Sequence, residues 1–134
     1  MATVFVNGTF DILHPGHLSM LEFAREQGDY LIVGIDTDER VKSKKGPTRP
    51  INNVDVRIRM LSALRCVDEV VTFSTDEELI ELVKSCDIMV KGSDYAGKSV
   101  IGSTYAKQLI FYDLIHGYST TNIIKRINTR ITDR

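Results

Sequence analysis

The sequence reads Gly8-Thr9-Phe10-Asp11-Ile12-Leu13-His14-Pro15-Gly16-His17 directly after a short β-branched and aromatic run at residues 3–6. Apolar residues then recur at helical spacing over residues 15–27. A strand, a tight turn and a helix are therefore predicted at the start of the chain. Gly8 permits the turn, Pro15 can begin the helix because its missing N–H would have no partner there, and Gly16 leaves room for a ligand.

Apolar runs and amphipathic segments alternate along the rest of the chain. Further strands are predicted at residues 30–35, 69–73, 88–90 and 109–112. Helices are predicted after a cap at Asn52 or Asn53 and at residues 76–85, 100–107 and 119–127, followed by a frayed tail at 128–134. Residues 40–53 are polar and aperiodic, so they are predicted to form a mobile surface loop.

This alternation predicts the architecture. Strands that alternate with helices imply right-handed crossovers and a parallel sheet covered on both faces. We therefore expect a single Rossmann-like, doubly wound α/β domain over residues 1–134, with a five-stranded parallel sheet and helices on both faces. In such folds ligands bind at the carboxyl ends of the strands, where the strand order reverses. The polar and glycine-containing segments of this chain follow predicted strands.

Composition and charge restrict the functional class. The chain has 134 residues, 43% hydrophobic and 26% charged, with a formal charge of -1. This is typical of a soluble globular protein, without the basic excess of nucleic-acid-binding proteins. The start does not resemble a signal peptide and no apolar run could span a bilayer, so we expect a cytoplasmic protein without membrane or nucleic-acid partners. Cys66 and Cys86 are far apart and predict reduced, buried thiols.

His14 and His17 are the strongest candidates for catalysis. They are three residues apart across the first turn of a predicted helix, so both can point into one space and donate hydrogen bonds to phosphate oxygens. The helix start is itself a candidate phosphate cradle. The alternatives are that the histidines cap the helix or pack beside the sheet, or that they bind zinc, for which only Asp11 and the remote His116 could add ligands.

Two further segments carry polar groups that suit phosphate binding. Ser119, Thr120 and Thr121 offer successive hydroxyls at a predicted helix start, although capping alone would explain one of them. Lys44 and Lys45 lie in the predicted loop, where a solvated basic segment is the alternative interpretation.

With these motifs, the chain resembles the cytidylyltransferase-like nucleotidyltransferases, whose signature is H-x-G-H after the first strand. The resemblance covers residues 4–127. It implies that His14 and His17 bind the triphosphate at the transferring α-phosphate, and that an S-T-T motif holds the outer phosphates. It also implies that Lys44 or Lys45 closes over the substrate and the triphosphate.

The resemblance assigns binding residues as well. Lys91-Gly92-Ser93-Asp94-Tyr95 matches a G-x-D-[WY] segment that lines the nucleotide and acceptor pocket, although Asp after Gly is also usual in turns. Arg57 matches an anion-binding arginine; otherwise it would be an exposed helix residue. The expected nucleotide-binding residues are Gly8, Thr9, Phe10, Gly16, Lys91, Gly92, Asp94, Tyr118, Ser119, Thr120 and Thr121. The expected substrate-binding residues are Asp11, Asp36 and Arg57.

The implied reaction moves a nucleoside monophosphate from a nucleoside triphosphate to a phosphorylated small molecule and releases pyrophosphate. The acceptor phosphate is ionised at neutral pH and can attack without a general base, so the protein supplies position and charge. Mg²⁺ is the expected cofactor and is carried by the triphosphate, with no certain protein ligand. Relatives are commonly dimers, so a homodimer is expected.

Two subfamilies compete for the substrates. Residues 8–13 and 36–39 resemble glycerol-3-phosphate cytidylyltransferases, which use CTP. Residues 44–52, 91–95 and 117–124 resemble the adenylyltransferase domain of bacterial heptose-1-phosphate enzymes. The arginine that glycerol-phosphate enzymes carry before S-T-T is missing here, where the chain reads Leu114-Ile115-His116-Gly117. We therefore expect ATP and a sugar 1-phosphate such as heptose 1-phosphate. A third hypothesis is a non-catalytic nucleotide-binding module.

Overall fold

Five parallel strands form the centre of the protein in the computed structural model, which describes residues 1–97, 99–113 and 119–132. The strands are β1 (Thr3–Gly8), β2 (Tyr30–Asp36), β3 (Glu69–Phe73), β4 (Ile88–Gly92) and β5 (Gln108–Tyr112). They are hydrogen-bonded in the order β3-β2-β1-β4-β5. The predicted five-stranded parallel sheet is confirmed.

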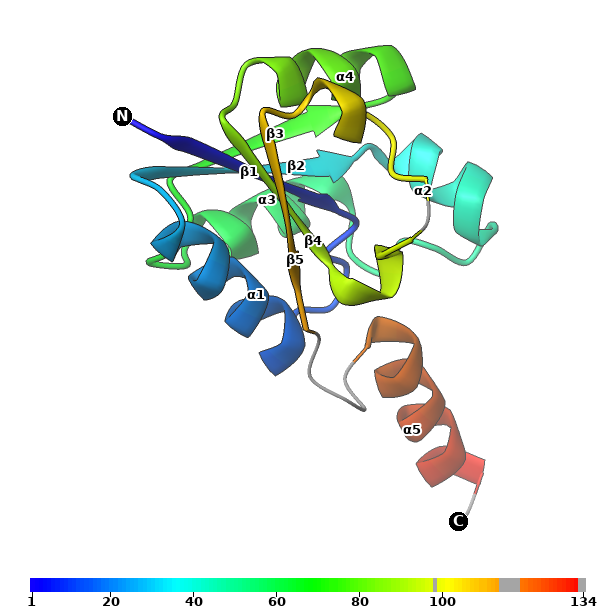
Figure 1. Ribbon diagram of the computed structural model, residues 1–134. Helices are drawn as coiled ribbons and strands as arrows, with labels where there is room; N and C mark the ends of the chain where they lie inside the picture. The colour runs from blue at the N-terminus through cyan, green and yellow to red at the C-terminus, as the bar shows by residue number, and fades with distance from the viewer. Residues whose placement is uncertain (98, 114–118, 133–134) are drawn as a thin grey trace.

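Helices cover both faces of this sheet (Figure 1). On one face lie α1 (Pro15–Glu26) and α3 (Val54–Ser62), and on the other lies α4 (Asp76–Lys84). The alternation of side chains along β1 explains both layers, because Val4 and Val6 belong to the core beneath α1 while Phe5 packs with Leu79 of α4. The doubly wound arrangement is therefore built from two separate apolar clusters.

The strand order reverses between β1 and β4. Strand β1 pairs with β2 along its whole length, from Thr3 to Gly8. Its pairing with β4 is confined to Val4 and Phe5, opposite Ile88 and Met89. Between the carboxyl ends of β1 and β4 the sheet is thus not closed by paired residues, which is where a fold of this class binds its ligands.

The predicted mobile loop is wrong over its first part, because residues 40–45 belong to helix α2 (Asp38–Lys45). The hydroxyl of Thr37 accepts a hydrogen bond from the Arg40 N–H at 3.4 Å and caps this helix. Acidic residues occupy the first turn and lysines the last, which matches the helix dipole. Because Val41 is the only buried residue of α2, the periodicity is too weak to reveal the helix from sequence.

Two other predicted boundaries differ from the structure. Within residues 100–107, regular structure is limited to a 3₁₀ helix at Ser103–Tyr105, preceded by Gly102 with φ 83°. The last helix, α5 (Thr120–Thr132), extends through most of the tail that was predicted to be frayed. Of the two cysteines, Cys86 is buried as expected, whereas Cys66 is only half-buried.

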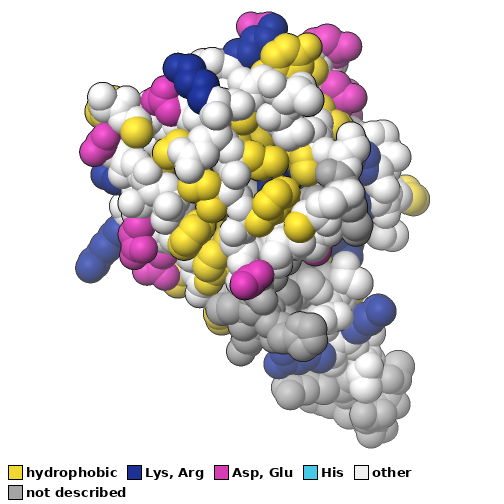
Figure 2. Space-filling model, in the orientation of Figure 1, with side chains coloured by type: hydrophobic (Ala, Val, Ile, Leu, Met, Phe, Trp, Pro, Cys, Tyr) yellow, Lys and Arg dark blue, Asp and Glu magenta, His cyan; other side chains and the backbone are white. Residues whose placement is uncertain are grey.

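The edge strand β5 lies at the front in Figure 1. Figure 2 shows hydrophobic side chains gathered on this face of the molecule, and Phe111 of β5 is 38% exposed. Helix α5 projects away from the sheet beyond it.

Candidate active site

The turn after β1 is shaped by two residues that contact each other. A Cβ atom on Gly8 would lie 3.0 Å from a ring carbon of Phe10, so glycine at this position avoids a tight contact with that ring. Phe10 itself adopts a positive φ of 49° and is 4% exposed. A non-glycine residue in this conformation is uncommon and is held there by its surroundings. The chain is thereby turned sharply toward α1.

His14 and His17 lie together at the start of α1. The Nδ1 atom of His14 accepts hydrogen bonds from the N–H groups of Gly16 at 3.1 Å and His17 at 3.3 Å. The two imidazole rings stack with centroids 3.7 Å apart. Since Nδ1 of His14 is an acceptor, its neutral ring carries the proton on Nε2 and can donate it. The predicted convergence of the two histidines is confirmed, and His14 also serves as the cap of α1.

Both histidines are neutral in the absence of a ligand. Burial lowers the pKa of His17 to about 3, with smaller contributions from His14 and Lys45. Burial also lowers the pKa of His14. The buried Nδ1 of His17 has no hydrogen-bond partner among the described residues. The pair therefore offers uncharged N–H donors to an anion at neutral pH.

A first cavity of about 270 Å³ opens beside this histidine pair. It is bounded by the turn after β1, the start of α1, the end of β4 and the start of α5, with Lys45 at its edge. The expected nucleotide-binding residues that line it are Gly8, Thr9, Phe10, Gly16, Lys91, Gly92, Asp94, Ser119, Thr120 and Thr121. The structure thus brings these residues together, while Tyr118 lies outside the described part of the chain.

The start of α5 is tied to the first turn and to the segment after α2. The Ser119 hydroxyl accepts a hydrogen bond from the Asn122 N–H at 3.0 Å, so its capping role is confirmed. The Thr120 hydroxyl donates to the carbonyl of Ile12 at 3.3 Å. Arg49 donates to the Thr121 hydroxyl at 3.2 Å. These contacts hold a second helix start against the first cavity, which is a favourable place for an anion.

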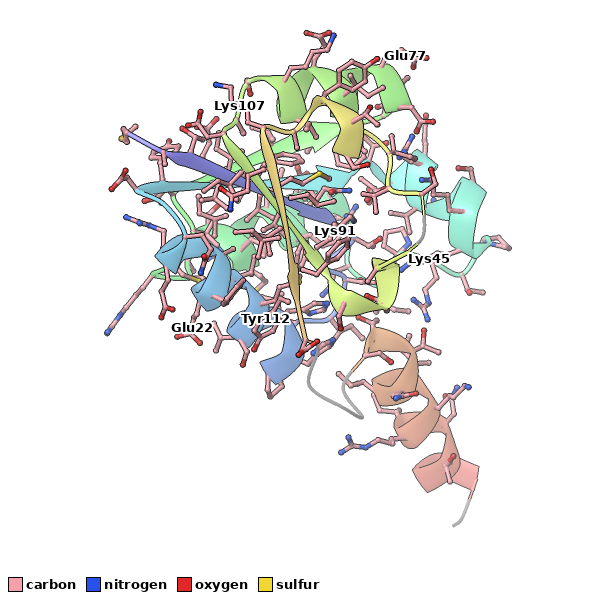
Figure 3. All side chains as sticks on the ribbon, viewed as in Figure 1. Glu22, Lys45, Glu77, Lys91, Lys107 and Tyr112 are labelled. Carbon is pink, nitrogen blue, oxygen red and sulfur yellow. The ribbon has the colours of Figure 1, made fainter. Side chains whose placement is uncertain are left out.

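Lysines approach this end of the sheet from two elements (Figure 3). Lys91 of β4 is 9% exposed, its ammonium group lies 3.5 Å from the carbonyl of Asn7, and burial lowers its pKa. Lys45 at the end of α2 is exposed as a whole residue, yet partial desolvation and Arg49 lower its pKa. Lys45 lines the first cavity, whereas Lys44 does not. The structure therefore distinguishes the two lysines that the sequence left equivalent.

A second cavity of about 280 Å³ adjoins the first on the β2 side. Lys44 lines it together with Asp36, whose carboxylate pairs with Arg40 at 3.1 Å. Its other wall is apolar and includes Phe73 and Val100. Of the expected substrate-binding residues, Asp36 is the one found in a cavity wall.

Asp11 and Arg57 lie beneath the site rather than in either cavity. Arg57 is 1% exposed, donates hydrogen bonds to the carbonyls of Thr9, Asp36 and Asn52, and pairs with Asp38 at 2.7 Å. The alternative of an exposed helix residue is therefore wrong, and the guanidinium group is committed to the protein backbone. The Asp11 carboxylate accepts hydrogen bonds from the N–H groups of Ile51 at 2.7 Å and Asn52 at 2.8 Å. Both residues fix the loops that form the site.

Sequence reasoning missed one residue that faces both cavities. Asn7, near the carboxyl end of β1, lines the first and the second cavity. Its side-chain oxygen is buried and has no hydrogen-bond partner in the described structure. A polar residue at the end of an otherwise apolar strand was the available signal.

Comparisons with known proteins agree with this geometry. The bifunctional protein HldE of Helicobacter hepaticus is 52% identical over 126 residues, which are 92% of this chain and 26% of that protein. The bifunctional protein HldE of Campylobacter concisus is 50% identical over 131 residues, which are 97% of this chain and 28% of that protein. The chain therefore spans about a quarter of the length of these relatives.

The fold is also found in a solved structure, and a family model covers most of the chain. The lipopolysaccharide core biosynthesis protein from Thermoplasma volcanium superposes with a TM-score of 0.72 at 25% identity, over 86% of this chain and 98% of that one. The sequence model described as cytidylyltransferase-like matches residues 5–126. This range includes the H-x-G-H turn, Lys44 and Lys45 of α2, and the S-T-T helix start. The chain therefore belongs to the cytidylyltransferase-like family.

Proposed function

We propose that this chain transfers a nucleoside monophosphate from a nucleoside triphosphate to a phosphorylated sugar and releases pyrophosphate. The observation that carries the proposal is the first cavity, where the stacked pair His14 and His17, the start of α5 and Lys45 converge at the point of strand-order reversal. Two helix starts, two neutral imidazoles and a lysine form a strong binding site for a polyphosphate.

The chemistry follows from this set of groups. The ionised acceptor phosphate attacks the α-phosphorus, a new P–O bond forms, and the bond from that phosphorus to the bridging oxygen of the β-phosphate breaks. The electron pair leaves with pyrophosphate, so no proton has to be removed and no general base is required. His14 and His17 donate hydrogen bonds to the transferring phosphate, while Lys45 offsets the charge that develops on the departing oxygens.

The residues of this site fit a magnesium ion that is bound to the triphosphate rather than to protein ligands. The groups around the first cavity are mainly cationic or neutral donors, which suit phosphate oxygens rather than a metal ion. Asp94 is the carboxylate found in the wall of the first cavity, whereas Asp11 is engaged with two backbone N–H groups and Asp36 with Arg40. A Mg²⁺ ion that enters on the triphosphate would neutralise charge on its oxygens.

We further propose ATP and heptose 1-phosphate as the preferred pair. Resemblance of residues 44–52 and 117–124 to heptose-phosphate adenylyltransferases supports ATP. The relatives named HldE support a sugar phosphate as the acceptor, and so does a structural neighbour that is named as a lipopolysaccharide core biosynthesis protein. The proposed setting is a cytoplasmic homodimer with neither nucleic acid nor membrane as a partner. Among the described residues, no helix has the length and apolar character required to cross a bilayer.

A matrix of substrates tests the proposal. ATP and CTP are each incubated with Mg²⁺ and with heptose 1-phosphate or glycerol 3-phosphate, pyrophosphate is measured, and the product is identified by mass. ADP-heptose as the main product is expected. CDP-glycerol as the main product would show that CTP and glycerol 3-phosphate are the substrates, and nucleotidyl transfer would still be the reaction. Nucleotide binding by calorimetry without pyrophosphate from any pair would instead indicate a non-catalytic nucleotide-binding module.

A further inference from the structure

Arg49 connects the segment after α2 to the wall of the first cavity. Its guanidinium group donates a hydrogen bond to the Thr121 hydroxyl at 3.2 Å. Thr121 lies at the start of α5 and lines the first cavity but not the second. The guanidinium group therefore lies within hydrogen-bond distance of a residue in that wall. Arg49 is not among the residues expected from the sequence to bind the nucleotide or the acceptor.

The backbone is held on both sides of Arg49. The Arg49 N–H group donates to the carbonyl of Gly46 at 3.2 Å, which closes a turn directly after α2. Beyond Arg49, the N–H groups of Ile51 and Asn52 donate to the Asp11 carboxylate at 2.7 and 2.8 Å. The backbone from which the Arg49 side chain extends is thus tied to α2 and to the turn that carries the histidine pair.

Most of the hydrogen-bonding capacity of this guanidinium group is unused. A guanidinium group has five N–H donors, and the bond to Thr121 is the one that the Arg49 side chain forms within the described residues. Across the same residues, no carboxylate forms an ion pair with Arg49, whereas Arg40 and Arg57 are each paired with one. Arg49 is therefore a cation with donors to spare for an anionic ligand.

A second cation lies close to Arg49. Lys45 lines the first cavity, and burial lowers the pKa of its ammonium group. The charge of Arg49 lowers this pKa further, and the opposite effects of Asp36 and Asp11 do not compensate. Like charges at short range repel each other, and an anion that contacts both removes this cost. Lys45 and Arg49 thus form a pair of cations that suits a ligand with several negative charges.

We propose that Arg49 binds the β- and γ-phosphates of the nucleoside triphosphate, the two groups that leave as pyrophosphate. This inference rests on the proposed nucleotidyl transfer. With the transferring α-phosphate at the histidine pair, the outer phosphates extend toward the start of α5, where Arg49 contacts Thr121. Negative charge increases on the departing oxygens as the P–O bond breaks, and a guanidinium group can donate to two of these oxygens at once.

Two substitutions separate the charge of Arg49 from its hydrogen bond to Thr121. Arg49→Gln keeps a donor but removes the charge, whereas Arg49→Lys keeps the charge but loses the planar set of donors. Calorimetry in the presence of Mg²⁺ measures the Kd of ATP, of AMP and of inorganic pyrophosphate. Arg49→Gln should raise the Kd of ATP and of pyrophosphate about tenfold or more, and that of AMP less than about twofold, because AMP lacks the outer phosphates. Arg49→Lys should give intermediate values for ATP and pyrophosphate.

Arg59→Gln is the matched control. Arg59 is exposed on α3 and lines neither cavity, so this variant makes the same change in net charge away from the site. All three Kd values should stay as in the unmodified protein. In Arg49→Gln, kcat at saturating ATP should also fall about tenfold or more, since the departing pyrophosphate loses a charged partner.

The outcomes separate this inference from the proposed function. If the unmodified protein releases no pyrophosphate from ATP with any sugar phosphate, the proposed function fails. If it does release pyrophosphate but Arg49→Gln weakens AMP as much as ATP, Arg49 only holds the segment after α2 in place, and the inference is wrong while the proposed function stands. Unchanged Kd values of ATP and pyrophosphate in Arg49→Gln would overturn the inference in the same way.

Discussion

His14 caps the helix that carries His17. Its Nδ1 accepts hydrogen bonds from the N–H groups of Gly16 and His17, and its ring stacks on that of His17 at 3.7 Å. One side chain thus fixes the start of α1, the orientation of its neighbour and its own tautomer. The capping role and the phosphate-binding role are therefore combined in His14 and need to be separated by experiment.

Replacing His14 with two different residues separates these roles. His14→Ala and His14→Asn should both lower kcat about 100-fold, since loss of one transition-state donor costs roughly 3 kcal/mol. Only His14→Ala should also lose about 1 kcal/mol of stability, because Asn can cap a helix. Turnover and urea unfolding measure the two effects. A near-normal kcat in His14→Asn would show that His14 only caps the helix.

His17 makes stability depend on pH. Its pKa is lowered from 6.5 to about 3 in the folded state, so between these values the unfolded chain binds a proton that the folded chain does not. Stability is therefore lost as the pH falls from 6.5 toward 3, with a slope of at most about 1.4 kcal/mol per pH unit from this residue.

The variant His17→Gln should remove this contribution. The stability of this variant toward urea, relative to that of the unmodified protein, should increase as the pH is lowered from 7 toward 4. If the free energies of unfolding of the two proteins differ by the same amount at every pH, the lowered pKa of His17 is contradicted.

Lys45 should matter more than Lys44. Only Lys45 lines both cavities, so Lys45→Ala should reduce kcat/KM about 100-fold for ATP and for the acceptor. Lys44→Ala should reduce kcat/KM for the acceptor but not for ATP, because Lys44 lines the second cavity and not the first. Lys42→Ala is the control, since Lys42 is exposed on the same helix and lines neither cavity. Full activity of Lys45→Ala would exclude a catalytic role for Lys45.

Arg57 should contribute to stability rather than to anion binding. Arg57→Ala breaks the ion pair with Asp38 and leaves three backbone carbonyls without their donor, so we expect a loss of about 3 kcal/mol or more in the free energy of unfolding. Arg59→Ala, an exposed position on the same helix, should change stability little. A stable Arg57→Ala protein with weakened ATP binding would restore the anion-binding role.

The sheet and the first cavity were predictable because their signals are local. Each strand is a short apolar run, and the turn from Gly8 to His17 combines the glycine, proline and histidines that a phosphate site at a helix start requires. Side-chain types at fixed spacing were enough to place His14, His17 and the S-T-T helix start at one end of the sheet.

The remaining features depend on contacts between distant segments. Helix α2 buries one residue, so no periodicity marks it, and its arginine is held by Asp36 and by Asp76 at 2.7 Å. Arg57 serves backbone carbonyls from three separate segments, which no spacing in the sequence reveals. Asn7 stands out only once the two cavities are seen to share it.

The most direct test of nucleotidyl transfer follows the position of isotopic label. ATP labelled at the α-phosphate or, separately, at the γ-phosphate is incubated with the protein, Mg²⁺ and heptose 1-phosphate. We predict that the α-label appears in the sugar nucleotide and the γ-label in pyrophosphate, because the acceptor attacks the α-phosphorus. Appearance of the γ-label on the sugar, or in orthophosphate with the α-label left in ADP, would contradict this account.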